Sequence, residues 1–203
     1  LIKYASNAFL ATKISFINEV SNLCEKTGVD IKDISLGMGL DQRIGDRFLR
    51  AGPGYGGSCF PKDTQAIVTI AKKFKTNLSI IKTVIKSNNE RSKILLNRIL
   101  NIMNNKIKNK NITFLGVTFK ANTDDMRESP SLKLIPMLLK KGANIIYYEP
   151  TGKKSEFSKY KKVKYQENIS SACKKSDLII LYSEWNEFKQ LNFNKLVNKA
   201  NFK

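Results

Sequence analysis

The stretch from Ala51 to Asp63, AGPGYGGSCFPKD, combines a cysteine, a lysine and an aspartate with four glycines. Pro61 suits the first turn of a helix, where its missing N–H is not needed, so we expect a helix to begin near it. Cys59 then precedes a helix N-terminus, and the helix dipole together with Lys62 favours the thiolate form of its side chain. The sequence therefore predicts a reactive thiol at Cys59, with an ordinary surface loop that carries a chance cysteine as the alternative.

Asp63 lies four residues after Cys59, in the first turn of the same predicted helix. A carboxylate at this place complements the helix dipole, and it could also orient a water molecule for attack on a covalent intermediate. The chain contains no histidine, which excludes Ser–His and Cys–His dyads and the common histidine metal sites. Cys24, Cys59 and Cys173 are far apart and form no C-x-x-C pair, so we expect neither a disulfide framework nor a metal site.

The residues before this loop predict one long amphipathic helix that ends at Gly28, a helix stop signal. On one face of it, apolar residues recur every seven positions: Ile2, Phe9, Phe16 and Leu23. A second stripe, with steps of three and four residues, runs through Lys3, Asn7, Leu10, Ile14 and Ile17. Lys3 and Asn7 are therefore candidates for a half-buried polar site, and two solvated residues near a helix end are the alternative.

The rest of the N-terminal half also has helical signals. Residues 29–50 predict a short helix, a turn punctuated by glycine and a second short helical piece. Two longer helices follow, one from near Pro61 to about Lys75 and one over roughly 79–104. The polar stretch at 104–111 ends this pattern, so we predict a helical domain over 1–104 and a second domain over 105–203.

The second half alternates between strand and helix signals. ITFLGV and NIIYY predict buried strands on either side of a helix with Pro130 near its start and Gly142 at its end, and DLIILY at 177–182 predicts a further strand. We predict an α + α/β fold, in which the helical domain is followed by a small Rossmann-like domain with a parallel sheet. The chain ends in NKANFK without another strand signal, so we expect this domain to be truncated at its C-terminus.

The composition is that of a globular protein with a large excess of positive charge. The formal net charge is +19, which could indicate nucleic-acid binding, but lysines occur in every segment and no nucleic-acid motif accompanies them. We therefore expect no nucleic-acid partner. The sequence has no apolar run of about 20 residues and no signal peptide at its N-terminus, so we expect a cytoplasmic protein without a membrane segment.

Four segments occur in the order found in the UDP-glucose/GDP-mannose dehydrogenase family: LIKYASNAFLATKISFINEV, GPGYGGSCFPKDT, GVTFKANTDDMRESPS and SEWNEF. The chain resembles the central helical domain and the C-terminal sugar-nucleotide-binding domain of the branch that oxidises UDP-glucose. No G-x-G-x-x-G fingerprint follows a predicted strand, so the family's N-terminal NAD-binding domain is expected to be missing. We expect the fragment by itself to be inactive.

The resemblance implies an NAD-dependent oxidation of UDP-glucose to UDP-glucuronate in two hydride transfers, through a thiohemiacetal and a thioester on the cysteine. The catalytic residues that it implies are Cys59, Lys3, Asn7 and Asp63. The substrate-binding residues that it implies are Lys3, Asn7, Arg43, Phe48, Leu49, Arg50, Ala51, Gly52, Gly56 and Lys120. It further implies contacts of Lys62 and Arg127 with NAD, no metal, and a homodimer through the central helices in which Arg43 reaches the neighbouring subunit's substrate.

Three alternatives to UDP-glucose oxidation stay open. Relatives that act on GDP-mannose or on a UDP-N-acetylhexosamine are the nearest, although Ser58 stands where we expect a histidine in the hexosamine enzymes. The third is a non-catalytic fragment that binds sugar nucleotides or mediates dimerisation.

Overall fold

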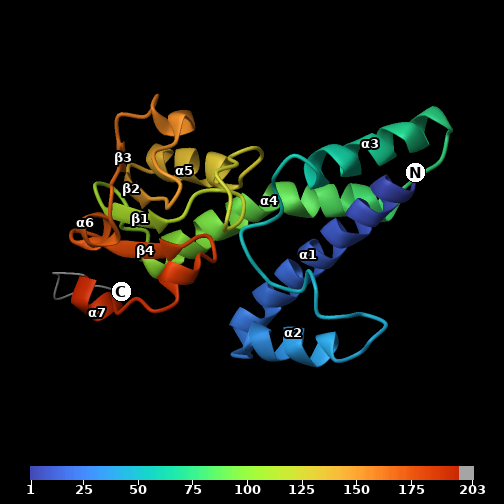
Figure 1. Cartoon of the computed structure of the whole chain (residues 1–203), viewed down its shortest axis with the longest axis horizontal. Coiled ribbons are helices and arrows are strands. Elements are labelled where there is room, and N and C mark those ends of the chain that lie inside the picture. Colours follow the sequence, from blue (N-terminus) through green and yellow to red (C-terminus); the bar gives the residue numbers. More distant parts are fainter. Residues whose placement is uncertain (197–203) are drawn as a thin grey trace. The chain divides into compact units, whose positions relative to one another are not determined.

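The computed structural model describes residues 1–196 of the 203-residue chain. The chain forms two compact units, Leu1–Ser92 and Lys93–Lys203, which we describe separately (Figure 1). This division falls inside helix α4 (Ser79–Ile102). The predicted domain boundary at 104/105 follows the end of α4 and stays a prediction. The expected truncation of the second domain rests on residues 198–203, which lie outside the described residues.

The first unit is helical, as predicted. Besides the first part of α4 it contains three helices: α1 (Ile2–Thr27), α2 (Ile31–Gly39) and α3 (Phe60–Lys73). Helix α1 ends because Gly28 adopts the left-handed conformation with φ 75°. Asp30 caps the start of α2, since its side chain accepts a hydrogen bond from the Lys32 N–H. Helices α1 and α3 pack against each other and so bring their side chains together.

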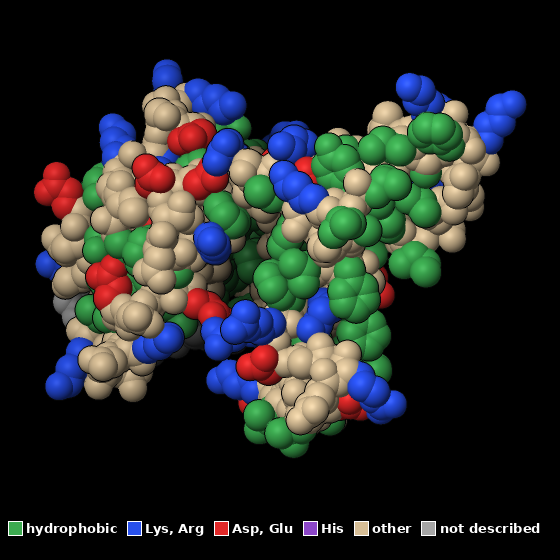
Figure 2. Space-filling view, turned by 45° about the vertical axis from the view of Figure 1, so that its right-hand side comes forward, with side chains coloured by type: hydrophobic (Ala, Val, Ile, Leu, Met, Phe, Trp, Pro, Cys, Tyr) green, Lys and Arg blue, Asp and Glu red, His purple; other side chains and the backbone are tan. Residues whose placement is uncertain are grey.

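The buried side of α1 is built from small and polar residues rather than from the heptad stripe. The residues that it buries are Ala8, Ala11, Ser15, Ile17, Asn18, Ser21 and Cys24. By contrast, the stripe of residues at seven-residue spacing is exposed: Ile2 86%, Phe9 66%, Phe16 50% and Leu23 61%. Figure 2 shows apolar side chains gathered on the visible face of this unit. Within the residues that the structure describes, α1 therefore exposes a stripe of large apolar side chains.

The second short helical piece predicted before the glycine loop is wrong, because residues 41–48 form turns. Asp41 accepts a hydrogen bond from the Arg43 N–H at 2.9 Å, a local turn that competes with helix formation. Gly45 and Phe48 then adopt left-handed conformations, with φ 70° and 65°, which end any helical run.

The second unit contains a parallel sheet, as predicted. Its strands are β1 (Asn111–Leu115), β2 (Asn144–Tyr148), β3 (Val163–Tyr165) and β4 (Leu178–Leu181), in the order β3-β2-β1-β4. All three pairings are parallel, and Phe114 on the central strand lies in register with Tyr147 and Ile180. Strand β3 was not predicted, since VKY is three residues long and lies among lysines.

Helices cover both faces of this sheet. The helices of this unit beyond α4 are α5 (Ser131–Lys140), α6 (Ile169–Cys173), α7 (Phe193–Leu196) and two 3-10 turns, η1 (Ser155–Phe157) and η2 (Asn186–Phe188). Phe114 packs with α5 and the end of α4 on one face, whereas Leu115 packs with α6, η2 and α7 on the other. Neighbouring residues of a strand point to opposite faces, so this division follows directly from strand geometry. Among the described residues, none of the helices has the length and apolarity needed to cross a bilayer.

Candidate functional site

The polar site of the first unit is built where the start of α1 meets the first turn of α3. The Asn7 side-chain amide donates a hydrogen bond of 2.6 Å to Asp63 Oδ2. Lys3 Nζ lies 3.9 Å from the same oxygen and completes an ion pair. Lys3 and Asn7 are one helical turn apart, so the packing of α1 on α3 places both side chains over one carboxylate. The structure thus brings together three of the four predicted catalytic residues.

The Asp63 carboxylate is buried and only partly satisfied. Its side chain is 1% exposed, compared with 67% for its partner Lys3. Whereas Oδ2 has both partners, Oδ1 is buried with no hydrogen-bond partner among the described residues. A buried carboxylate oxygen without a partner is costly, and a water molecule or a substrate hydroxyl would supply the missing donor. The arrangement therefore suits a general base.

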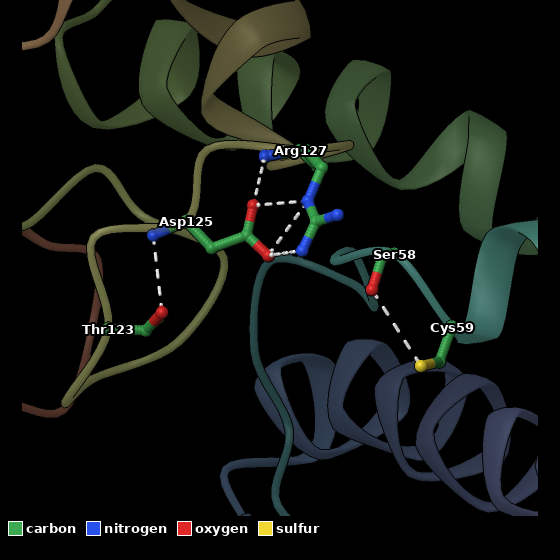
Figure 3. A network of polar contacts seen from close by, with 5 residues as sticks. All are labelled: Ser58, Cys59, Thr123, Asp125 and Arg127. Carbon is green, nitrogen blue, oxygen red and sulfur yellow. Dashed lines mark hydrogen bonds and ion pairs between the residues drawn. The ribbon is translucent and has the colours of Figure 1, made fainter.

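Cys59 is the residue that immediately precedes α3. Its thiol is exposed, its backbone carbonyl accepts a hydrogen bond from the Asp63 N–H at 2.8 Å, and no cysteine of the described chain forms a disulfide. Its sulfur lies 3.7 Å from the Ser58 hydroxyl, and the two side chains point toward each other (Figure 3). Cys59 and Asp63 are four residues apart, about one helical turn, and the thiol is exposed whereas the carboxylate is buried. Lys62, in this turn, is exposed.

The predicted substrate loop before Cys59 is partly buried. Leu49 is almost fully buried and its carbonyl accepts a hydrogen bond from the Ser35 hydroxyl at 2.7 Å, while Arg50 is exposed. The ring of Phe48 contacts that of Phe60, with 5.9 Å between their centroids. Ala51 and Gly52 are half-buried and Gly56 is buried. The loop thus exposes the side chains of Phe48 and Arg50, while Leu49 is buried.

Arg43 lies in the turns after α2 and is not part of the Asp63 cluster. Its guanidinium is 89% exposed and forms an ion pair with Asp41 at 2.6 Å. The hydrogen bonds from Arg43 lower the pKa of Asp41 and raise that of Arg43 itself. Within the single chain, Arg43 thus extends into solvent.

Lys120 belongs to the second unit, in the loop that follows the carboxyl end of β1. In the sheet, β2 and β3 lie on one side of β1, and β4 lies on its other side. The direction in which successive strands are added therefore reverses, and the point of reversal is between the neighbours β1 and β4. Ligands of open α/β sheets bind at the carboxyl ends of the strands next to such a reversal. Lys120 is exposed there, with its ammonium 5.5 Å from the centroid of the Phe119 ring.

Two buried charged residues that the sequence did not single out hold this loop. The Glu149 carboxylate, fully buried at the end of β2, accepts hydrogen bonds from the N–H groups of Val117 (2.7 Å) and Thr118 (3.2 Å). Lys154 donates to the Asp124 carbonyl at 3.4 Å and is 6% exposed. Both ends of the segment that carries Lys120 are therefore held. For Glu149 the sequence offers one signal, a glutamate directly after an apolar strand, and for Lys154 it offers none.

Arg127, the second predicted cofactor contact, ends the same loop. Its guanidinium pairs with Asp125 at 2.8 Å, and the carboxylate faces it in Figure 3. The hydrogen bonds from Arg127 are the largest cause of the lowered pKa of Asp125. A cavity of about 620 Å³ in this unit lies elsewhere, since Asn111 and Asn144, the first residues of β1 and β2, line it together with five lysines. None of the predicted site residues lines that cavity.

Family models match both halves of the chain. Residues 1–90 match the central domain of the UDP-glucose/GDP-mannose dehydrogenase family, and residues 113–203 match the UDP-binding domain of the same family. The two matches follow each other in the order that the chain's two units have.

Individual proteins are similar over nearly the whole chain. A UDP-glucose 6-dehydrogenase of Rickettsia felis is 45% identical over 100% of this chain and 46% of its own length. UDP-glucose 6-dehydrogenase YwqF of Bacillus subtilis is 48% identical over 94% of this chain and 43% of its own length. The structure of a UDP-glucose dehydrogenase from Pyrobaculum islandicum superimposes with a TM-score of 0.87 at 34% identity, over 95% of this chain and 44% of that protein. The chain thus spans less than half the length of these relatives.

Proposed function

The chain belongs to the UDP-glucose/GDP-mannose dehydrogenase family, and we propose that it supplies the thiol site and the sugar-nucleotide site of a UDP-glucose 6-dehydrogenase. The observation that carries this proposal is the Asp63 carboxylate, held by Asn7 and Lys3 with one buried oxygen left without a partner, one turn from Cys59. This arrangement suits a water attack on an acyl group carried by sulfur.

In the proposed reaction, NAD⁺ held with the help of Lys62 and Arg127 would supply the oxidising chemistry, by taking up a hydride first from the alcohol carbon and, in a second round, from the thiol adduct. The Cys59 thiolate adds to the aldehyde carbon left by the first transfer and forms a thiohemiacetal. Loss of the second hydride turns this adduct into a thioester. Water then attacks the thioester carbon and the C–S bond breaks. The products are the carboxylate and the Cys59 thiolate, with one proton taken up by Asp63 and the other released to solvent.

The chain's other residues have distinct tasks in this proposal. The Lys3 ammonium and the Asn7 amide stabilise negative charge on the reacting oxygen, a role worth about 2.7–4 kcal/mol for one donor in a comparable site. Asp63 Oδ1 accepts a proton from the attacking water. An amide and an ammonium on Oδ2 keep the carboxylate oriented for this task.

Substrate and cofactor contacts complete the proposal. Phe48–Gly52 and Gly56 hold the sugar, and Lys120, an exposed cation at the carboxyl end of β1, binds the sugar nucleotide. The similarity to proteins named UDP-glucose 6-dehydrogenase, at 45% and 48% identity, favours UDP over GDP. Lys62 and Arg127, both exposed cations in loops or first turns, contact NAD. We propose a cytoplasmic location, because Cys59 must remain a free thiol.

A homodimer through the exposed stripe of α1 is part of this proposal. Residues repeated every seven positions form the contact seam of paired helices, and the stripe is exposed in the part of the chain that the structure describes. A two-fold dimer would also allow Arg43, which extends into solvent, to reach the partner's substrate.

Titration calorimetry of the 203-residue chain tests the proposed substrate. We expect saturable binding of UDP and UDP-glucose and weaker binding of GDP-mannose and UDP-N-acetylglucosamine. A clear preference for a GDP sugar would overturn the choice of substrate.

Activity assays require a site for the hydride acceptor. For these assays we propose a fusion protein in which the N-terminal portion of the Bacillus subtilis relative is placed before Leu1. This fusion protein is called the extended polypeptide below.

A further inference from the structure

The glycine loop cannot set its own conformation. This loop, residues 49–59, contains no helix or strand. Gly54 and Gly57 take left-handed conformations with φ 115° and 76°. Glycine has the largest backbone freedom in the unfolded and loosely held states, so a loop with four glycines needs external contacts to keep one shape. Side chains of α1 and α4 supply these contacts.

Asn88 on α4 forms a two-way hydrogen-bonded pair with the backbone of Tyr55. The Tyr55 N–H donates to Asn88 Oδ1 at 2.9 Å, and Asn88 Nδ2 donates to the Tyr55 carbonyl at 3.1 Å. An amide side chain has both the acceptor and the donor that this pairing needs, whereas a carboxylate has acceptors only. Tyr55 itself is buried, so its position fixes the middle of the loop.

Asn18 and Arg91 hold Gly52 in the same two-way manner. The Gly52 N–H donates to Asn18 Oδ1 at 2.7 Å, and Arg91 Nε donates to the Gly52 carbonyl at 3.0 Å. Arg91 is 5% exposed and is itself held by α1, through the Asn18 carbonyl at 3.2 Å and Asn22 Oδ1 at 2.6 Å. The planar guanidinium of Arg91 thus has donors on two backbone carbonyls and on the Asn22 side chain, which links Gly52 to α1 in a fixed geometry.

We propose that Asn18, Asn88 and Arg91 form a loop clamp that positions the backbone of residues 52–55 around the sugar of the substrate. This inference rests on the proposed function, because it assigns these residues to the sugar-holding loop. They are positioning residues and need not touch the substrate. Cys59 follows Tyr55 by only four residues, so the clamp also limits where the thiol can lie. The clamp therefore acts on binding of the sugar more than on binding of the nucleotide.

Amide hydrogen exchange and calorimetry of the 203-residue chain together test the clamp. The variant Asn88→Leu keeps the side-chain size but removes both hydrogen bonds, and Arg91→Lys keeps the charge but removes the planar fork. Matched controls on the same helix are Asn97→Leu and Arg98→Lys, since both residues are exposed. Thermal unfolding of each variant reports whether it folds.

We expect the Tyr55 amide of Asn88→Leu to exchange at least about tenfold faster, and UDP-glucose to bind about tenfold more weakly, the effect of losing a hydrogen bond or two. UDP without its sugar should change by no more than about twofold, and the controls should match the parent chain. Equal losses for UDP and UDP-glucose, or unchanged binding of UDP-glucose despite faster exchange, would overturn the clamp.

A failure of the proposed function gives a different result. In that case the unmutated chain does not bind UDP-glucose, while slow exchange of the Gly52 and Tyr55 amides still reports the clamp's hold on the loop. If Asn88→Leu and Arg91→Lys do not fold, the unmutated chain decides: exchange of these two amides at the rates of an unstructured peptide would overturn the clamp.

Discussion

Asp63 shows how a single side chain can combine two environments. One oxygen has an amide and an ammonium as partners, and the other is buried without a partner. Burial of a polar atom without a hydrogen-bond partner lowers the free energy of unfolding by about 1–3 kcal/mol. Folded proteins therefore contain few such atoms, and one beside a reactive thiol is consistent with a functional role. The sequence predicted Lys3, Asn7 and Asp63 as candidates, since their spacing along two helices is local information. The Asn88 and Arg91 contacts could not be predicted, because they join residues more than 30 positions apart.

The variant Asp63→Asn removes the proposed base but keeps the size and most hydrogen bonds of the side chain. We expect thioester hydrolysis in the extended polypeptide to slow by about 10²–10⁴-fold, the usual contribution of general base catalysis. The acyl group should then accumulate on Cys59 and be visible by intact-mass spectrometry after incubation with UDP-glucose and NAD⁺. Normal turnover with no trapped adduct would remove Asp63 from this role.

The three cysteines should differ sharply in their reaction with iodoacetamide. Cys59 is exposed, whereas Cys24 and Cys173 are buried, and burial raises the pKa of Cys173 to about 11. A raised pKa means that the thiolate of Cys173 forms only as the pH approaches 11, so at pH 8 its thiolate fraction is about one in a thousand. Mass spectrometry of the folded chain at pH 8 should find one adduct, on the peptide with Cys59, and none in Cys59→Ser. Labelling of Cys173 at this pH would contradict the described burial.

At the scale of elements, α1 carries two different faces. The sequence predicted the helix and its stop at Gly28. In the structure Ile17 of the second stripe is buried, whereas the residues at seven-residue spacing are exposed. The rest of the buried side consists of alanines, serines, Asn18 and Cys24, small or polar side chains that allow the close approach of neighbouring helices and contribute little to an apolar pattern. The three-residue strand β3 was missed for a similar reason, since a short edge strand among lysines carries almost no apolar signal.

The double variant Phe9→Glu and Phe16→Glu tests the proposed role of the exposed stripe. Burial of one Phe side chain contributes about 1.5–3 kcal/mol, and a two-fold dimer buries each residue twice, so charges at both positions should abolish the dimer. Sedimentation velocity should show a dimer for the parent chain and a monomer for the variant. The control Phe74→Glu changes an equally exposed aromatic residue outside the stripe and should remain dimeric. A monomeric parent chain, or a variant that stays dimeric, would contradict this assignment.

At the scale of the whole molecule, the chain joins two units with different tasks. The helical unit contains the thiol, its carboxylate and the clamped loop, and the α/β unit presents Lys120 and Arg127 at the carboxyl end of its sheet. The alternation of strands and helices predicted the second unit well, since parallel strands buried on both faces have long apolar runs. The proposed reaction further requires a hydride acceptor. Because the relatives are more than twice as long as this chain, their additional residues are included in the extended polypeptide for the activity assays.

Production of UDP-glucuronate by the Cys59→Ser variant of the extended polypeptide is the most direct measurement of the central claim. Serine keeps the size of the side chain but lacks the sulfur nucleophile, so we expect the parent to produce the acid and the variant to produce none. The control Cys24→Ser, a change at a buried cysteine far along α1, should retain production. Undiminished formation of UDP-glucuronate by Cys59→Ser would contradict the covalent role of this thiol.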